Sequence, residues 1–145
     1  MARTTLIISL DGAPIAKGRP RGSIGKDGKP HFHTPKATKS YENALGMTAL
    51  SCMNKLGGGK WTGRLQVYVE AHVAVPKSWS AEKRDWALKN RISPGKPDLD
   101  NYVKIVLDAL NGVVYDDDSQ VQRIMAYKKY SRAPQMYVAI KELEI

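Results

Sequence analysis

Cysteine and acidic residues are both scarce in this 145-residue chain. Cys52 is the only cysteine, which excludes an intrachain disulfide and any zinc cluster built on cysteines, and which fits a reducing cytoplasm. The 14 Asp and Glu residues face 23 Lys and Arg residues, so the formal net charge is +9 at pH 7. This imbalance is typical of a protein that binds a polyanion, and solubility alone is the alternative explanation.

Long hydrophobic runs and basic amphipathic helices are also missing. The apolar run near the N-terminus, residues 6–10, is too short for a signal peptide or a membrane span. We therefore expect no membrane partner. A hydrophobic content of 42% and a charged content of 26% are ordinary for a globular protein. The length predicts one domain over residues 1–145.

The pattern of apolar residues predicts an α+β domain with a mixed, largely antiparallel sheet and two main helices packed on it. Alternation and β-branched residues predict strands at residues 5–10, 65–75, 121–130 and 136–143. A hairpin tip is expected at residues 26–29, with residues 31–33 as its returning strand. Helices are expected from Thr34-Pro35 to residue 56, at residues 79–89 and at residues 101–110. Their buried residues are expected to include Tyr41, Leu45, Thr48, Cys52, Leu56, Trp86 and Leu88.

Positive charge concentrates in the first sixty residues, where ten Lys and Arg residues face three acids. Lys and Arg neutralise phosphates and supply most of the sequence-independent affinity for nucleic acids. Scattered surface charge is the alternative. The candidate phosphate contacts are Lys17, Arg19, Arg21, Lys26, Lys29, Lys36 and Lys39, together with Lys96 beside the acidic segment described next.

Six of the 14 acidic residues fall within one segment, residues 98–118. Asp98 and Asp100 are two apart, so in an extended backbone their carboxylates project to one side and can share an ion. Asp100 is also placed to cap a helix, and Lys104 follows it by four residues. Asp108 lies about 12 Å further along such a helix, and is expected to pair with Lys104 or to face solvent.

Several carboxylates brought together repel one another unless a cation neutralises them. Oxygen ligands without cysteine or histidine suit Mg²⁺, with Mn²⁺ as a possible substitute. Such ions polarise a phosphodiester and lower the pKa of an attacking water. The residues therefore indicate a metal-dependent nuclease. The alternative is a DNA-binding protein without nuclease activity, in which the aspartates cap a helix and line a turn.

The acidic segment resembles the RusA family of Holliday junction resolvases, in the type found in phages and prophages. The resemblance rests on Lys96-Pro97-Asp98-Leu99-Asp100-Asn101, Lys104, Asp108-Ala109-Leu110-Asn111-Gly112 and Asp117-Asp118-Ser119-Gln120-Val121. Lys17-Gly18-Arg19-Pro20-Arg21, Thr34-Pro35 and Tyr41-Glu42 also resemble phage-type members.

The resemblance implies a Mg²⁺-dependent crossover junction endodeoxyribonuclease that acts in recombination and repair. It would cut four-way DNA junctions by paired symmetric incisions, as a homodimer, in the cytoplasm of a bacterium or of a phage-infected cell. A nuclease selective for flaps or forks remains an alternative.

By position, the resemblance implies Asp98, Asp100 and Asp118 as catalytic metal ligands and Lys104 as the catalytic lysine. Asp117 would be a helper ligand. The turn after the helix is about one residue shorter than in some relatives, so Asp117 and Asp118 could exchange roles.

Overall fold

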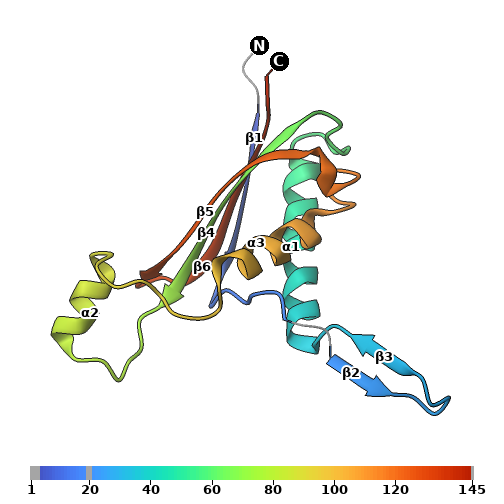
Figure 1. The fold of residues 1–145 in the computed structure, drawn as a ribbon. Coiled ribbons are helices and arrows are strands. Elements are labelled where there is room, and N and C mark those ends of the chain that lie inside the picture. Colours follow the sequence, from blue (N-terminus) through green and yellow to red (C-terminus); the bar gives the residue numbers. More distant parts are fainter. Residues whose placement is uncertain (1–3, 19–20, 145) are drawn as a thin grey trace.

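Four strands form one mixed sheet in the computed structural model, which describes residues 4–18 and 21–144 (Figure 1). They are β1 (Thr5–Asp11), β4 (Leu65–Ala74), β5 (Val121–Ser131) and β6 (Gln135–Glu142), in the spatial order β1-β6-β4-β5. β6 pairs antiparallel with both β1 and β4, whereas β5 runs parallel to β4. The predicted strands and the mixed, largely antiparallel sheet are confirmed.

The two faces of the sheet differ because β4 alternates along its length. Leu65, Val67, Val69 and Ala71 are fully buried on one face. The residues between them are only half-buried on the other face. Alternate residues of a strand point to opposite sides of a sheet, so this period of two aims one side of β4 at the core.

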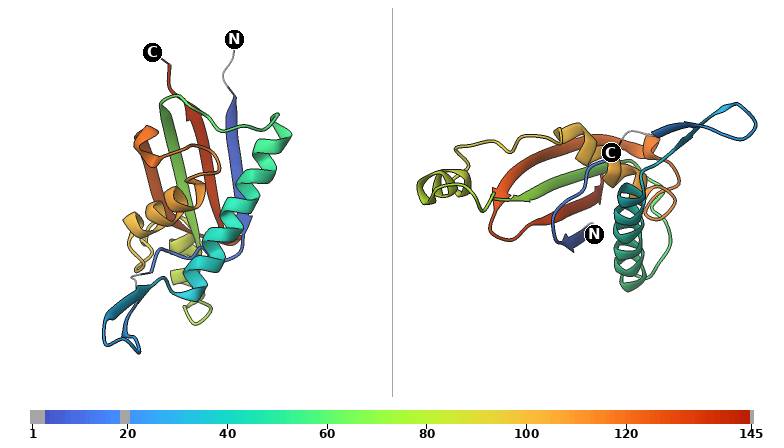
Figure 2. Two further views of the ribbon diagram at one scale, coloured as in Figure 1. Left: turned by 90° about the vertical axis from the view of Figure 1, so that its right-hand side faces the viewer. Right: turned by 90° about the horizontal axis from the view of Figure 1, so that it is seen from below.

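Two helices cover the buried face of the sheet: α1 (Lys36–Lys55) and α3 (Leu99–Leu110) (Figures 1 and 2). α3 is strongly amphipathic, and its Ile105, Val106 and Leu110 are buried in the core. No helix within residues 4–18 and 21–144 covers the opposite face in these views. The predicted α+β class with two main packed helices is confirmed.

The buried stripe of α1 differs in part from the prediction. Tyr41 and Leu45 are buried as expected, but the stripe continues at intervals of four through Ala49 and Met53. The predicted stripe took a step of three after Leu45, which moved the later positions off the buried face. Leu56 lies beyond the end of the helix and is 48% exposed. The helix also begins later than predicted, with Pro35 as its N-cap residue.

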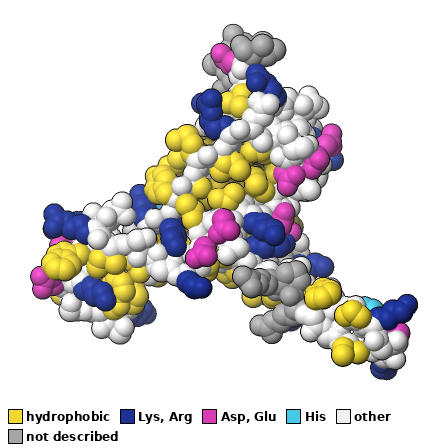
Figure 3. All heavy atoms as spheres, in the orientation of Figure 1, with side chains coloured by type: hydrophobic (Ala, Val, Ile, Leu, Met, Phe, Trp, Pro, Cys, Tyr) yellow, Lys and Arg dark blue, Asp and Glu magenta, His cyan; other side chains and the backbone are white. Residues whose placement is uncertain are grey.

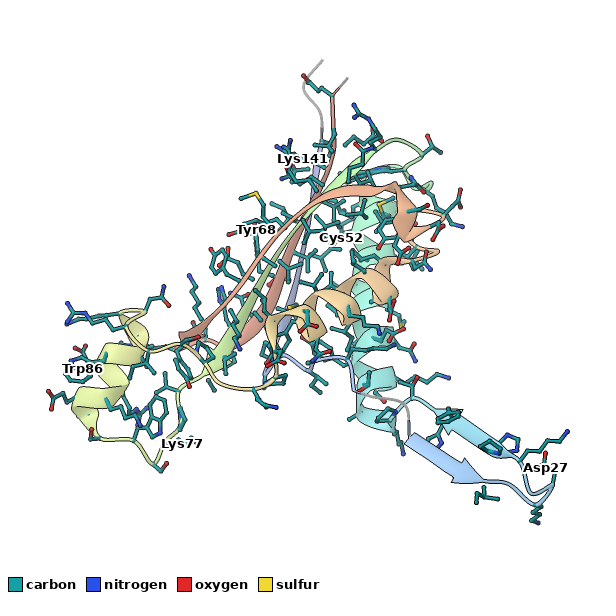
Figure 4. The ribbon with its side chains drawn as sticks, in the orientation of Figure 1. Asp27, Cys52, Tyr68, Lys77, Trp86 and Lys141 are labelled. Atoms are coloured by element: carbon teal, nitrogen blue, oxygen red, sulfur yellow. The ribbon has the colours of Figure 1, made fainter. Side chains whose placement is uncertain are left out.

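A third helix, α2 (Ala81–Leu88), lies beyond one end of the sheet, where it contacts β5. Ser80 caps its start and accepts a hydrogen bond from the Lys83 amide at 3.2 Å. The predicted packing through Trp86 is wrong, because this side chain is 45% exposed and Ala87 is buried instead (Figure 4). A helix this short and polar buries little surface, so its indole remains accessible.

The predicted hairpin forms a separate two-stranded sheet of β2 (Arg21–Ile24) and β3 (Pro30–His33). We call residues 21–33 the hairpin arm. It projects away from the rest of the molecule beside the start of α1 (Figure 1). None of the helices in the described parts of the chain is long and apolar enough to span a membrane.

Candidate active site

Asp98 and Asp100 lie at the start of α3, where the first helical amides are unpaired and the helix dipole favours negative charge. Asp98, rather than Asp100, is the N-cap residue, with φ −67° and ψ 151°. Its side chain makes no capping hydrogen bond, and Asp100 lies in the first turn. The predicted capping role of Asp100 is therefore wrong. Both carboxylates are exposed.

Lys128 of β5 holds the loop before Asp98 through hydrogen bonds, and this residue was not predicted from the sequence. Its Nζ donates to the carbonyl oxygens of Gly95 at 2.8 Å and Pro97 at 3.1 Å. Lys128 pairs with the buried Ala71 across β4 and β5, so it belongs to the face that carries the helices. The signal in the sequence was a lysine at a strand position whose neighbours on the same face point toward the core.

Lys17 joins the segment before the hairpin arm to both core helices. Its backbone amide donates to the Asn101 carbonyl of α3 at 3.0 Å. Its Nζ lies 2.8 Å from Glu42 of α1 and 3.0 Å from Asp108 of α3. Burial alone would lower the pKa of Lys17, but the hydrogen bonds and charges of Glu42 and Asp108 outweigh it and raise the pKa. Asp108 is thus the partner of Lys17 and not of Lys104.

We expect Lys17→Met to lower the free energy of unfolding by about 2 kcal/mol, because it leaves two half-buried carboxylates without their cation. The Lys17 side chain is only 17% exposed. Urea unfolding at pH 7 measures the change. Lys60→Met is the matched control, since the Lys60–Asp116 pair is 45% and 71% exposed and should contribute less than about 0.5 kcal/mol. Equal losses in the two variants would contradict this role of Lys17.

Asp117 and Asp118 lie at the start of the short 3₁₀ helix η1 (Asp118–Gln120). Asp117 and Gln120 form a capping box, in which each side chain bonds the other residue's backbone. Gln120 Nε2 also donates to the carbonyls of Trp61 at 2.9 Å and Gly63 at 3.0 Å, which ties this turn to the body of the protein. The glutamine of the Asp-Asp-x-Gln motif is therefore a positioning residue for the two aspartates.

The two neighbouring carboxyl groups of η1 are electrostatically coupled. The hydrogen bond with Asp117 raises the pKa of Asp118, and the nearby charge of Asp108 adds to the rise. Hydrogen bonds from Ser119 and Asp118 lower the pKa of Asp117. Two carboxylates this close compete for one proton unless a cation neutralises them.

The structure places the predicted ligands at two ends of α3. Asp98 and Asp100 precede or begin the helix, whereas η1 follows its C-terminal end without returning to the helix start (Figure 1). The acidic residue of α3 whose charge raises the pKa of Asp118 is Asp108. Among the described residues, no three carboxyl, imidazole or thiol groups lie close enough to hold a metal ion. A single site shared by Asp98, Asp100 and Asp118 stays a prediction.

Salt bridges divide the acidic residues into two groups. Asp108 is paired with Lys17, and Asp116 with Lys60 at 3.2 Å. Asp98, Asp100, Asp117 and Asp118 have no salt bridge with any residue in the described ranges. These are the three aspartates that the sequence motif predicts as ligands, together with the predicted helper Asp117. Their charge is therefore available to an incoming cation.

Basic residues lie close to Asp98 and Asp100 in the sequence and are exposed. Acidic and basic side chains gather over α3, between the projecting α2 and the projecting hairpin arm (Figure 3). Lys104 is exposed on α3, Lys36 at the start of α1, and Lys96 in the loop before Asp98. Arg19 lies outside the described residues, and only the backbone of Arg21 is described.

The sequence of the whole fold matches a known protein family. The model of the family described as endodeoxyribonuclease RusA matches residues 11–141, which include Lys17, the hairpin arm, α3 and η1. The chain belongs to the RusA family. It is also 39% identical over 135 residues to the protein named "Uncharacterized protein YqaN" of Bacillus subtilis (strain 168), covering 91% of this chain and 92% of that protein. Membership in the RusA family indicates endodeoxyribonuclease activity, with DNA as the partner.

Proposed function

We propose that this RusA family member is a Mg²⁺-dependent endonuclease that resolves four-way DNA junctions by paired symmetric incisions. The observation that carries the proposal is the division of the acidic residues by their salt bridges. Asp98, Asp100, Asp117 and Asp118 form no salt bridge with the residues that the structure describes, whereas Asp108 pairs with Lys17 and Asp116 with Lys60. Unpaired carboxylates repel DNA, so their presence beside a DNA-binding surface calls for a cation.

The chemistry of these residues fits Mg²⁺. All are exposed carboxylates, and Mg²⁺ prefers oxygen ligands and retains several waters, so one or two carboxylates suffice at each end of α3. Asp98 and Asp100 would hold one ion at the helix start, and Asp118, with Asp117 as helper, would hold a second ion in η1. When bound, the ion would polarise the scissile phosphate and neutralise charge on the leaving oxygen.

The remaining residues of the proposed site supply charge and position. Lys104 lies one helical turn after Asp100 and would stabilise negative charge that develops on the phosphate. Lys17 is mostly buried between two carboxylates, so we expect it to position α3 and the hairpin arm. Lys36 and Lys96 are exposed and suited to phosphate contacts.

A homodimer is the arrangement that paired incisions require. A four-way junction presents symmetry-related strands, and a two-fold dimer places one active site on each of two opposed strands. One chain carries one set of Asp98, Asp100, Asp118 and Lys104, so a single copy cuts one strand at a time.

The deciding experiment incubates the protein with a synthetic four-way junction, with and without Mg²⁺, and maps incisions on all four strands. We expect Mg²⁺-dependent cuts at symmetric positions in two opposed strands. Flap, fork and linear duplex substrates serve as controls. Preference for flaps or forks would favour the alternative nuclease function. If millimolar Mg²⁺ changed neither cleavage nor melting temperature, the protein would be a DNA-binding protein without a metal site.

A further inference from the structure

The hairpin arm has an apolar face with nothing packed on it. Gly22 pairs with Phe32 and Ile24 with Pro30, so these four residues share one side of the ribbon. Phe32 is 72% exposed and Ile24 is 80% exposed. Hydrophobic side chains are visible on the surface of the projecting hairpin arm (Figure 3). Phe32 is also the only phenylalanine in the chain. Two large apolar side chains this exposed on a projecting element mark an interaction surface.

Phe32 is held flat against its partner strand. A Cβ added at Gly22 would lie 3.1 Å from the Phe32 ring, which is closer than ordinary van der Waals contact. The glycine therefore lets the ring rest on the opposite backbone, with its other side toward solvent. An aromatic ring presented in this way can stack on a base.

The far end of the hairpin arm is basic. Lys26 and Lys29 are exposed there, and Asp27 at the tip is the only acid in the hairpin arm (Figure 4). Asp27 is already engaged by His31 at 3.1 Å and by the Lys29 amide at 3.0 Å. Positive charge beside an apolar face suits a nucleic acid.

The root of the hairpin arm is tied to the helices of the candidate active site. Lys17 bonds the backbone of α3 and its Asp108, and the Gly18 amide donates to Thr38 Oγ1 of α1 at 3.2 Å. Gly18 also packs closely there, since an added Cβ would lie 3.0 Å from the same hydroxyl oxygen. The segment that leads into the hairpin arm is therefore fixed relative to α3.

We propose that the hairpin arm is a wedge that enters the DNA at its branch point. Phe32 and Ile24 pack on base faces that are unstacked there, and Lys26 and Lys29 contact the flanking phosphates. The proposal rests on the proposed function, because it assigns the recognition of branched DNA to one element of the same enzyme.

The test measures the affinity of Phe32→Ala for a four-way junction that carries 2-aminopurine beside the branch point, with EDTA present to prevent cutting. We expect affinity to fall between about fivefold and 100-fold, the range for losing one base-stacking aromatic, with loss of the 2-aminopurine fluorescence increase. Affinity for a linear duplex of the same sequence should change less than twofold. Met47→Ala is the matched control, because Met47 is a 73% exposed apolar residue on α1.

Three further outcomes separate this proposal from the proposed function. If wild-type protein cuts junctions and Phe32→Ala binds them equally well, the wedge is overturned while the resolvase function stands. If wild-type protein does not cut junctions, the proposed function fails and the wedge fails with it. If Phe32→Ala shifts the sedimentation coefficient of free protein and leaves the 2-aminopurine signal intact, the hairpin arm is a contact between protein copies, and the wedge is overturned.

Discussion

Asp118→Asn is expected to lower Mg²⁺-dependent junction cleavage by at least about 100-fold, equivalent to roughly 3 kcal/mol of transition-state stabilisation. Asn keeps the size of the side chain and removes the charge that would hold the cation. Asp118 is exposed and makes no salt bridge with a described residue, so folding should be unaffected. Affinity for the junction should stay the same or increase, since one negative charge near the phosphates is gone.

Asp116→Asn is the matched control, because it changes the same chemical group two residues away in the same turn. Asp116 already pairs with Lys60, and this exposed salt bridge contributes little. Its cleavage rate should remain within about twofold of wild type. The comparison uses cleavage rates at saturating protein, together with binding measured without metal. Normal cutting by Asp118→Asn would refute its assignment, and a loss confined to Asp117→Asn would transfer the role to Asp117.

The second large effect is expected at Glu70, which belongs to a polar cluster on the face of the sheet away from the helices. The Tyr68 hydroxyl donates to Glu70 Oε2 at 2.6 Å and lies 2.6 Å from the Tyr127 hydroxyl (Figure 4). His72 Nε2 lies 2.9 Å from Glu70 Oε1, and Lys129 Nζ lies 3.6 Å from the same oxygen. Burial alone would raise the pKa of Glu70, but these partners lower it from 4.5 to about 2.

Glu70→Gln is expected to lower the free energy of unfolding at pH 7 by as much as about 3 kcal/mol, the value of this pKa shift. The sign follows from proton binding. Between pH 4.5 and about 2 the unfolded chain binds the proton that folded Glu70 does not, so wild-type stability falls as pH falls. The difference between wild type and variant should therefore shrink across this window. Urea unfolding at several pH values from 2 to 7 measures it.

Glu82→Gln is the control for this experiment, because Glu82 is an exposed carboxylate in the first turn of α2. Its effect should stay within about 0.5 kcal/mol at every pH. Tyr68→Phe should remove part of the Glu70 effect, since one of its hydrogen bonds is lost. A constant difference between wild type and Glu70→Gln from pH 7 to pH 2 would contradict the low pKa.

Local patterns in the sequence were sufficient for most of the fold. Strand alternation from Leu65 onward and the turn at Asp27-Gly28 each reflect a preference that acts over a few residues. Such preferences survive in the folded protein because packing agrees with them. The predicted buried stripe of α1 was partly wrong. Helical spacing allows either Thr48 and Cys52 or Ala49 and Met53 to continue the stripe, and packing against the sheet buries the second pair.

The sequence by itself determined the class of fold, the basic charge and the acidic motif that marks the family. Only the tertiary structure decided which acid is paired with which base. Lys17 forms a salt bridge with Asp108, which lies 91 residues later in the sequence. Lys128 of β5 donates a hydrogen bond to the loop before Asp98. Contacts such as these depend on how helices and strands are placed relative to one another. The local periodicity of the sequence does not determine that placement. Among the described residues, these contacts leave Asp98, Asp100, Asp117 and Asp118 as the carboxylates of the acidic segment without a salt bridge.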